Sequence, residues 1–281
     1  MTAQQGKLGI IAGGGDLPAR LIEAAQASGR AVFVVALEGH ANDPMLQTVP
    51  HTVVRLGAAA RILGSLKAEK CEDVVLAGKV RRPSLAGIRP DWRGARLLMK
   101  MGLRALGDDG LLRLVGQELE KEGFRLVGVH DILTDLVTPE GVLGRVKPDD
   151  QAIRDAMHGL KIARLLGSAD VGQGCVVQQG LVLALEAIEG TDEMVRRSAL
   201  YARDGVGGVL VKASKPQQDK RLDLPAIGTI TIETAHKAGL RGVALLAGGT
   251  LIIDRDRVVD LANQYGLFVV GMMLDKANDH E

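Results

Sequence analysis

The feature that most constrains the fold lies near the N-terminus, where a short apolar run passes directly into a glycine-rich turn. Leu8–Ala12 has the length and composition of a buried strand, and Gly13-Gly14-Gly15-Asp16 follows it. Asp16 is expected to cap a helix that tolerates Pro18 in its first turn and ends near Gly29. A strand joined to a helix in this way is typical of a parallel sheet, so we expect a Rossmann-like domain here.

The glycine-rich turn is also a candidate anion site, because it presents backbone N–H groups beside the N-terminus of a helix. Gly13 and Gly15 match the first two glycines of the dinucleotide-binding fingerprint, whereas Pro18 replaces the third. Glu38 follows the next predicted strand, roughly where dinucleotide-binding proteins place a ribose-binding acid. An interpretation of the chain as an NAD(P)- or nucleotide-binding Rossmann-type protein therefore stays open.

Apolar strand-like runs alternate with amphipathic helical segments along the chain, and this alternation predicts an α/β protein with two domains. At 281 residues the chain is long enough for two cores. We expect a Rossmann-like parallel sheet in residues 1–136, a connector with Pro and Gly at 137–144, and an α/β domain with a mixed sheet in residues 145–281. Ligands bind at the carboxyl ends of strands in such sheets, so the ligand is expected in the cleft between the domains.

Further candidate residues of the N-terminal half follow predicted strands. Gly78, Lys79 and Arg81 come after the predicted strand 73–77, and they add positive charge at the edge of the sheet that carries the glycine-rich turn. A strand is also predicted at 124–129. It would place His130 near this edge, where we favour a structural role over a role as a proton shuttle.

A charged loop in the C-terminal half is the strongest candidate for catalysis. The run Lys215-Pro216-Gln217-Gln218-Asp219-Lys220-Arg221-Leu222-Asp223-Leu224 follows a predicted strand at 208–212 and ends at Pro225. A proline near each end fixes φ and stiffens the loop. Cations beside carboxylates suit a phosphate ester or anhydride, since cations bind phosphoryl oxygens and a carboxylate holds a metal ion or a water molecule. A solvated charged turn is the structural alternative.

Asp223 is the first catalytic candidate, because Pro225 restricts Leu224 to an extended shape and so displays the aspartate on a fixed backbone. The Asp223 carboxylate could ligate Mg²⁺ or another divalent cation, which prefers one or two carboxylates together with phosphate oxygens. It could instead orient the attacking water. The structural alternative is a helix cap or an ion pair with Arg221. Asp219 is the second catalytic candidate.

Two further groups of charged residues accompany this loop. Lys212 and Lys215 are candidate phosphate ligands that would act as point charges. An acidic group precedes a predicted helix, where its members would either touch substrate or metal, or form only a turn and a helix cap. This group comprises Glu186, Glu189 and Asp192, and Thr191 lies among them in the sequence.

Composition excludes several functional classes. The net charge is +1 and aromatic residues make up only 2% of the chain, which argues against a nucleic-acid-binding protein. The two cysteines are too few for a disulfide framework, and the sequence contains neither a signal-peptide pattern nor a membrane-spanning run. We therefore expect a cytoplasmic protein that can dock on a membrane surface and form a homodimer.

Eight short motifs, taken together and in order, resemble one family. They are Ile10-Ile11-Ala12-Gly13-Gly14-Gly15-Asp16-Leu17-Pro18, Ala77-Gly78-Lys79-Val80-Arg81-Arg82-Pro83, Gly107-Asp108-Asp109, Lys121-Glu122-Gly123-Phe124, Gly172-Gln173-Gly174, Glu186-Ala187-Ile188-Glu189-Gly190-Thr191-Asp192, Lys212-Ala213-Ser214-Lys215-Pro216-Gln217-Gln218-Asp219 and Asp223-Leu224-Pro225-Ala226-Ile227-Gly228. The chain resembles the UDP-2,3-diacylglucosamine pyrophosphatases of lipid A biosynthesis, of the type unrelated to calcineurin-like phosphoesterases. Each motif is weak alone, but the ordered set is specific.

The resemblance implies hydrolysis of UDP-2,3-diacylglucosamine to 2,3-diacylglucosamine 1-phosphate (lipid X) and UMP by direct attack of water. It implies Mg²⁺ or another divalent cation as the cofactor, held by Asp223, with Asp223 and Asp219 as catalytic residues. The residues expected to bind substrate are Gly13, Gly14, Gly15, Asp16, Gly78, Lys79, Arg81, Asp108, Gln173, Glu189, Thr191, Asp192, Lys212, Lys215 and Gln218.

Overall fold

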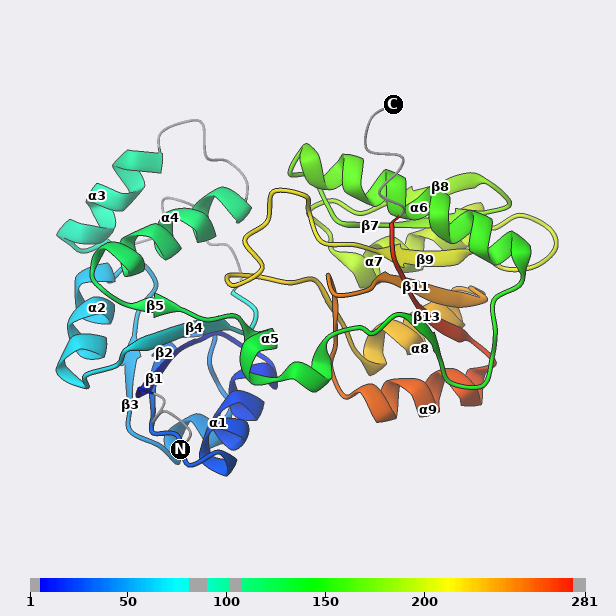
Figure 1. The fold of residues 1–281 in the computed structure, drawn as a ribbon. Helices are drawn as coiled ribbons and strands as arrows, with labels where there is room; N and C mark the ends of the chain where they lie inside the picture. Colours follow the sequence, from blue (N-terminus) through cyan, green and yellow to red (C-terminus); the bar gives the residue numbers. More distant parts are fainter. Residues whose placement is uncertain (1–5, 81–89, 102–107, 275–281) are drawn as a thin grey trace. The chain divides into compact units, whose positions relative to one another are not determined.

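A computed structural model describes residues 6–80, 90–101 and 108–274 (Figure 1). The chain forms two compact units. Unit 1 comprises residues 1–134 together with 219–223, and unit 2 comprises residues 135–218 together with 224–281. A five-residue segment from late in the sequence therefore packs with the N-terminal unit.

Unit 1 is built on a five-stranded parallel sheet with the strand order β3-β2-β1-β4-β5. The strands are β1 (Leu8–Ala12), β2 (Val32–Leu37), β3 (His51–Val54), β4 (Asp73–Ala77) and β5 (Arg125–Leu126). Strand β1 lies at the centre and is buried along its whole length. A continuous apolar run is what a parallel strand needs when helices cover both faces of its sheet.

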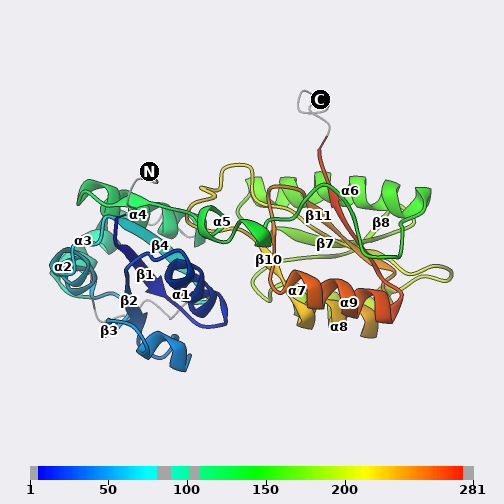
Figure 2. The same cartoon turned by 60° about the horizontal axis from the view of Figure 1, so that its bottom comes forward.

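The helices of unit 1 are α1 (Leu17–Ala27), α2 (Ala59–Ala68), α3 (Trp92–Met101), α4 (Asp108–Lys121) and α5 (Val129–Ile132), with the short helix η1 (Pro44–Gln47) and a further one, η4 (Thr134–Leu136), at the boundary of the unit. Leu66 of α2 and Leu119 of α4 pack in one core cluster with Phe33 and Val35 of β2. Helix α1 contacts β1 and β2 and lies on the other side of the sheet (Figures 1 and 2). Unit 1 thus has the helix–sheet–helix layers of a Rossmann-like domain.

Unit 2 contains a six-stranded mixed sheet with the strand order β6-β13-β11-β9-β7-β8. Strands β9, β11 and β13 are parallel, whereas β6 and β7 run antiparallel to their neighbours. The strands are β6 (Gly141–Leu143), β7 (Gly174–Gln178), β8 (Leu181–Leu185), β9 (Val209–Lys212), β11 (Gly242–Leu246) and β13 (Phe268–Met272), and a separate parallel pair is formed by β10 (Ala226–Ile227) and β12 (Leu251–Ile252).

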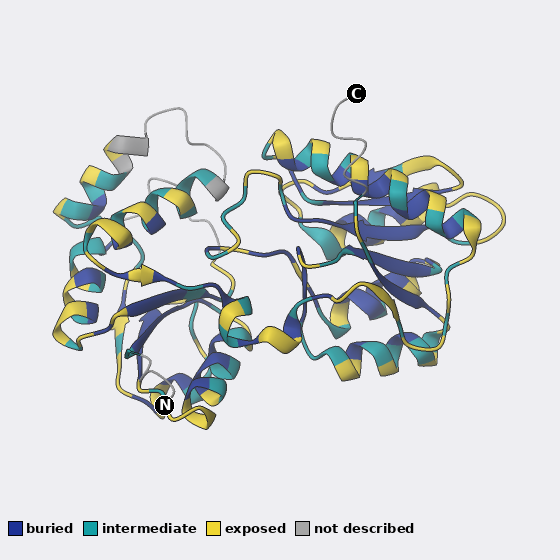
Figure 3. Ribbon diagram, in the orientation of Figure 1, coloured by how far each residue is buried: buried dark blue, intermediate teal, exposed yellow. Residues whose placement is uncertain are grey.

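Helices cover both faces of the unit 2 sheet, and the strands between them are buried (Figures 2 and 3). One face packs against the long helix α6, in which Ala156 and Leu160 contact the strand core. The opposite core cluster contains Met194, Ile232 and Val258 from three other helices. These elements are α6 (Asp150–Ser168), α7 (Thr191–Ser198), α8 (Thr229–Lys237), α9 (Arg255–Tyr265) and the short helix η5 (Ala199–Tyr201). The α/β class, the parallel N-terminal sheet and the mixed C-terminal sheet are therefore confirmed.

The structure differs from the sequence-based expectation around His130. The predicted strand at 124–129 is reduced to the two residues of β5, and His130 lies in helix α5. The physical reason is a local cap: the Gly128 N–H donates to Asp131 Oδ2 at 2.8 Å, which starts a helix where the apolar pattern predicted a strand. The interpretation of His130 as the end of a strand is wrong.

The segment predicted as a connector, 137–144, belongs to unit 2 in the structure. Gly141–Leu143 forms strand β6, which pairs antiparallel with β13 at the sheet edge, and the Thr138 N–H donates to the Thr250 carbonyl at 3.0 Å. Pro and Gly mark where the chain turns, but backbone donors and acceptors beside a sheet edge are satisfied by pairing with that edge. Among the described residues, no helix is long and apolar enough to cross a membrane.

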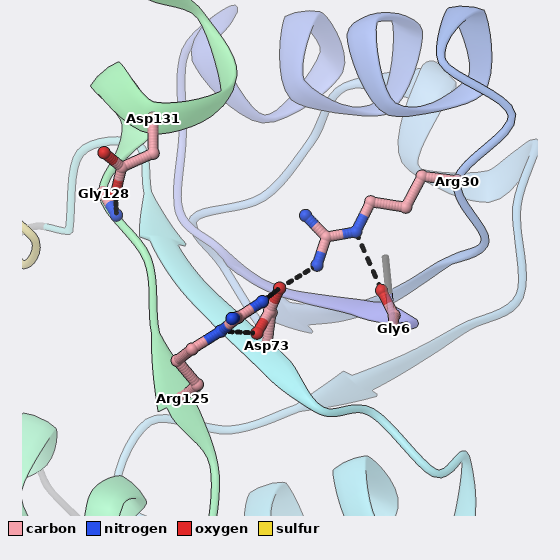
Figure 4. A network of polar contacts seen from close by, with 6 residues as sticks. All are labelled: Gly6, Arg30, Asp73, Arg125, Gly128 and Asp131. Carbon is pink, nitrogen blue, oxygen red and sulfur yellow. Dashed lines mark hydrogen bonds and ion pairs between the residues drawn. The ribbon is translucent and has the colours of Figure 1, made fainter. Parts of the chain in front are cut away.

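A buried carboxylate joins three segments of unit 1 at the amino end of β4 (Figure 4). Arg125 Nε donates to Asp73 Oδ1 at 2.5 Å, its terminal NH2 donates to Asp73 Oδ2 at 2.7 Å, and Arg30 also donates to Oδ2. Arg30 Nε further donates to the Gly6 carbonyl at 2.8 Å. Burial by itself raises the pKa of Asp73, but the hydrogen bonds from Arg125 and Arg30 outweigh it, so the pKa lies below its usual value.

Replacement of Asp73 with Asn is expected to lower the free energy of unfolding by about 3 kcal/mol at pH 7, because two guanidinium groups lose their buried counter-charge. Since the folded-state pKa of Asp73 is lowered, its contribution is present above the unfolded pKa of about 3.9 and is lost as pH falls through the folded value. Urea denaturation between pH 7 and pH 2.5 should therefore show the two proteins converging below about pH 4. A constant difference across this range would contradict the assignment, and Asp204→Asn on an exposed loop is the matched control.

Candidate functional site

Two loops at the carboxyl edge of the unit 1 sheet are joined to each other through their backbones. The Gly13 N–H donates to the Ala77 carbonyl at 2.8 Å, and Gly14 and Lys79 exchange two hydrogen bonds of 2.8 and 2.7 Å. The strand order reverses between β1 and β4, which these loops follow, and such a switch point is where open α/β sheets bind ligands.

Close backbone approach explains why glycines occupy this place. A Cβ on Gly13 would lie 2.7 Å from the Lys79 carbonyl oxygen, and a Cβ on Gly78 would lie 2.7 Å from the Gly14 carbonyl oxygen. Because the N–H groups of Gly13 and Gly14 already donate within the protein, they are not available to an anion. An anionic group at this turn would have to be bound by N–H groups from Gly15 onward.

The remaining candidates of unit 1 are placed as follows. Asp16 occupies the N-cap position of α1, but its backbone is already helical and its side chain makes no capping hydrogen bond, so the predicted cap is wrong. Asp16 and Lys79 are exposed. Asp108 is the first residue of α4. Arg81 lies outside the described residues.

A buried polar cluster lies in unit 2 where three chain segments meet. Strand β9 ends at Lys212, which is paired with Gly174 at the start of β7, while Glu186 follows β8 and Thr191 begins α7. Thr191 Oγ1 donates to Glu186 Oε1 at 2.6 Å, Lys212 Nζ donates to Thr191 Oγ1, and Lys212 Nζ lies 3.6 Å from Glu186 Oε1. Glu186 is 6% exposed and Lys212 is 5% exposed. We call Glu186, Thr191 and Lys212 the Lys212 cluster.

The motif Gly172-Gln173-Gly174 fits closely around Glu186. A Cβ on Gly172 would lie 2.0 Å from the Glu186 carbonyl oxygen, and a Cβ on Gly174 would lie 2.7 Å from Glu186 Oε2. The Glu186 N–H donates to the Gly174 carbonyl at 2.9 Å, and the Gln173 carbonyl accepts from the Ala213 N–H at 2.9 Å. Three motifs that are far apart in sequence therefore converge on one buried carboxylate.

Sequence reasoning named Thr191 and Lys212 as binding residues, and it placed Glu186 in an acidic group that would either touch substrate or metal or form only a turn and a helix cap. The available signal was a glutamate placed directly after an apolar strand, within a motif already singled out. What it lacked was the antiparallel pairing of β7 with β9, which brings Lys212 to the same end of the sheet.

The other predicted binding residues of unit 2 have partners outside the Lys212 cluster. Asp192 accepts a 3.0 Å hydrogen bond from Thr231, and Glu189 pairs with Arg197 at the surface. The hydrogen bonds from Arg197 hold the pKa of Glu189 below its usual value. Lys215 forms an ion pair with Asp170, and its backbone N–H donates to Gln218 Oε1 at 3.2 Å. The structure thus brings Thr191 and Lys212 together but not these four residues.

The loop that follows β9 is fastened to unit 1 through residues 219–223. Arg221 donates to both carboxylate oxygens of Asp219, at 3.0 and 2.7 Å, and to Glu120 of α4 at 2.9 Å. These hydrogen bonds hold the pKa of Asp219 below its usual value although burial opposes the shift. Arg221 therefore forms ion pairs with Asp219 and Glu120. The backbone N–H of Arg221 also donates to Asp219 at 3.0 Å, so the carboxylate of Asp219 accepts three hydrogen bonds from Arg221 in all.

Asp223 is exposed between two buried leucines. Leu222 belongs to the unit 1 core and lies so close to α4 that a Cβ on Gly116 would be 3.0 Å from its methyl groups. Leu224 is buried in unit 2. The alternating burial of these three residues leaves Asp223 exposed on this segment, as the sequence predicted.

Metal and thiol chemistry are restricted by what surrounds these residues. Within 6–80, 90–101 and 108–274, no group of three or more His, Cys, Asp or Glu side chains is arranged to hold a metal ion. A cation at Asp223 would therefore need oxygens from a ligand, as Mg²⁺ uses when it binds with phosphates.

Burial raises the pKa of the Cys71 thiol to about 11 and that of Cys175 to about 12, so neither is a ready nucleophile.

The chain is similar to proteins of one named family. Residues 7–136 match the model of the LpxI N-terminal domain, and residues 139–270 match that of the LpxI C-terminal domain. Over 273 residues, the chain is 45% identical to UDP-2,3-diacylglucosamine pyrophosphatase LpxI of Caulobacter vibrioides, and the match covers 95% of this chain and 97% of that protein.

Similarity to solved structures is remote. CobK precorrin-6A reductase matches with a TM-score of 0.34 and 14% identity over 96% of this chain and 88% of its own. UDP-glucose 4-epimerase of Thermus thermophilus, in complex with NAD, matches with a TM-score of 0.33 and 11% identity over 97% of this chain and 88% of its own. Matches this weak carry no argument about either fold or function.

Replacement of Leu222 with Ala should destabilise unit 1 by about 2–4 kcal/mol, because it removes a buried side chain from the core against α4. Hydrogen–deuterium exchange of the α4 peptides should accelerate in this variant. Leu224→Ala is the matched control, since Leu224 belongs to unit 2 and its loss should leave α4 exchange unchanged. Unchanged exchange in α4 of Leu222→Ala would show that the loop is not anchored there.

Proposed function

The chain belongs to the LpxI family of UDP-2,3-diacylglucosamine pyrophosphatases, and we propose that it hydrolyses UDP-2,3-diacylglucosamine to lipid X and UMP in lipid A biosynthesis. The observation that carries this proposal is 45% identity over 95% of the chain to the named pyrophosphatase. A dinucleotide-binding function is disfavoured, because Pro18 replaces the third fingerprint glycine and the N–H groups of Gly13 and Gly14 donate within the protein.

We propose that Asp223 orients and deprotonates the attacking water. Its exposure and the buried leucines on either side support this role, since a general base must reach solvent while its backbone stays fixed. The water oxygen bonds to phosphorus, the bridging P–O bond breaks, and the phosphate ester on the far side of that bond leaves with the electron pair. Asp219 already accepts three hydrogen bonds from Arg221, so fewer of its lone pairs are left for a water molecule.

The cationic side chains have a separate role, which is to bind the diphosphate. Lys212 is the side chain that we propose for this role, because Thr191 and Glu186 fix it at the end of β9. An ammonium that is already oriented loses little entropy when a phosphoryl oxygen binds to it. Lys215 shares its charge with Asp170, so its contribution should be smaller.

We propose that Mg²⁺ or another divalent cation enters with the substrate, with Asp223 as its protein carboxylate. The described residues fit such a site, because Asp223 is an exposed carboxylate and Mg²⁺ commonly takes one or two carboxylates with phosphate oxygens and water. When bound, the cation would neutralise charge that develops on the transferred phosphoryl group. UMP release should then fall to background with chelator and return when Mg²⁺ is added in excess.

Peripheral contact with the inner membrane remains part of the proposal, since the substrate carries two acyl chains. Helix α3 supports it: Trp92 and Met99 are 66% and 75% exposed, and with the exposed Arg96 they fall on one helical face. Trp favours the membrane–water interface and Arg is attracted to anionic lipids. Flotation with anionic vesicles would test this contact. The homodimer and the cytoplasmic location stay predictions, and sedimentation velocity would test the first.

Asp223→Ala should reduce UMP release from UDP-2,3-diacylglucosamine by about 10²–10⁴-fold, the range that a general base contributes. Substrate binding should persist, because removal of a carboxylate from an anionic site lowers like-charge repulsion. The variant should therefore retain intact substrate on purification, whereas the wild-type protein should retain lipid X.

Asp204→Ala is the control, because Asp204 is an exposed aspartate on a loop of unit 2 that carries no proposed role. Near-normal turnover by Asp223→Ala would place the catalytic carboxylate elsewhere, with Asp219 and Asp192 as the next candidates. A wild-type protein that does not release UMP but binds NAD(P) tightly would overturn the proposed function itself.

Turnover in water labelled with oxygen-18 should place the label in lipid X. This result follows if water attacks the β-phosphorus on the glucosamine side, which makes UMP the leaving group. Mass spectrometry of the two products distinguishes the outcomes, and label in UMP would exclude attack at that phosphorus.

A further inference from the structure

Glu186 is a buried carboxylate in which one oxygen accepts a hydrogen bond from the protein and the other has no donor among the described residues. Oε1 accepts from Thr191 at 2.6 Å and lies 3.6 Å from Lys212 Nζ. Oε2 is fully buried and accepts no hydrogen bond within the described part of the chain. An ionised oxygen that is removed from water without a donor is costly, so such atoms usually have a partner that binds to them.

The surroundings of Oε2 are built for this carboxylate. Glycine at position 174 leaves room for it, because a Cβ there would lie 2.7 Å from Oε2. The Lys212 cluster holds the other oxygen in place through Thr191 and Lys212. Gln173, which immediately precedes Gly174, also carries a buried acceptor, Oε1, with no partner in the described residues. Glu186 Oε2 and Gln173 Oε1 are thus two buried acceptors without a donor among the described residues, and they belong to segments that meet beside Lys212.

We propose that Glu186 Oε2 accepts a hydrogen bond from a neutral donor on the organic part of the bound ligand, either an O–H or an amide N–H. This inference rests on the proposed function and adds a residue that selects among sugar nucleotides. A carboxylate repels phosphate, so Glu186 would recognise not the diphosphate but the sugar or nucleoside attached to it. Sugar hydroxyls, an N-acyl amide, ribose hydroxyls and the uracil N–H all supply suitable donors.

Glu186→Gln tests the assignment, because Gln keeps the shape of the side chain. With its oxygen accepting from Thr191, the Gln side chain presents an amide N–H₂ at the position of Oε2, where an acceptor is needed. Three inhibitors separate the contributions: inorganic pyrophosphate has no organic donor, while UMP and lipid X each carry donors from one half of the substrate. The inhibition constant of either UMP or lipid X should rise by at least about tenfold. That of pyrophosphate should stay unchanged or fall, since a negative charge has been removed.

Glu193→Gln is the matched control, since Glu193 is exposed on α7 and pairs only with Arg196 in the described structure, and it should leave all three constants unchanged. Glu186→Asp is the second variant: it keeps the charge opposite Lys212 but withdraws the acceptor, and it should weaken the same product selectively. Thermal unfolding checks that each variant is folded.

Equal weakening of all three inhibitors would overturn the proposal, because Glu186 would then only hold Lys212 in place. Unchanged affinities for UMP and lipid X would overturn it as well, since Oε2 would then be satisfied by water alone. Failure of the wild-type protein to release UMP or to bind pyrophosphate is a different result, and it would count against the proposed function.

Discussion

A buried ammonium group needs counter-charge and acceptors, and Lys212 imposes this requirement on unit 2. Its position at the end of β9 is set by strand pairing, and its partners come from segments about 20 to 40 residues earlier in the chain. The requirement explains why glutamate follows β8, why threonine begins α7 and why glycine occupies position 174. The motifs that looked separate in sequence are parts of one buried cluster.

The charged loop that follows β9 solves a different physical problem, which is to keep a polar segment both fixed and exposed. Leu222 anchors it in the unit 1 core, and Asp219 with Arg221 and Glu120 forms a network of ion pairs at the same place. Exposed ion pairs alone contribute little to stability, so the buried leucine should supply most of the anchoring. Asp223, one residue further along, is thereby held at the surface of a fixed backbone.

Unit 1 places its buried charge network and its glycine-rich loops at opposite ends of its strands. The Asp73 network joins the amino ends of β4 and β5 to the segment after α1, while the loops that follow β1 and β4 meet at the carboxyl ends. In the glycine-rich turn, glycines that are needed for close backbone packing can be mistaken for glycines that bind an anion. Part of its glycine content serves the close contact with Lys79, and only the residues from Gly15 onward keep N–H groups that an anion could use.

Periodicity and turn chemistry in the sequence were enough to predict the α/β class, the parallel and mixed sheets, the position of nearly every strand and the exposure of Asp223. These properties depend on interactions between residues a few positions apart, which are visible in any short window. The ordered motifs identified the family. Tertiary structure alone decided that residues 219–223 belong to unit 1, that Arg221 pairs with Asp219 and Glu120, and that Glu186 lies against Lys212. The positions of residues 219–223, of Glu120 beside Arg221 and of Glu186 beside Lys212 depend on which strands and helices become neighbours, and local pattern carries no record of contacts between residues far apart in the chain.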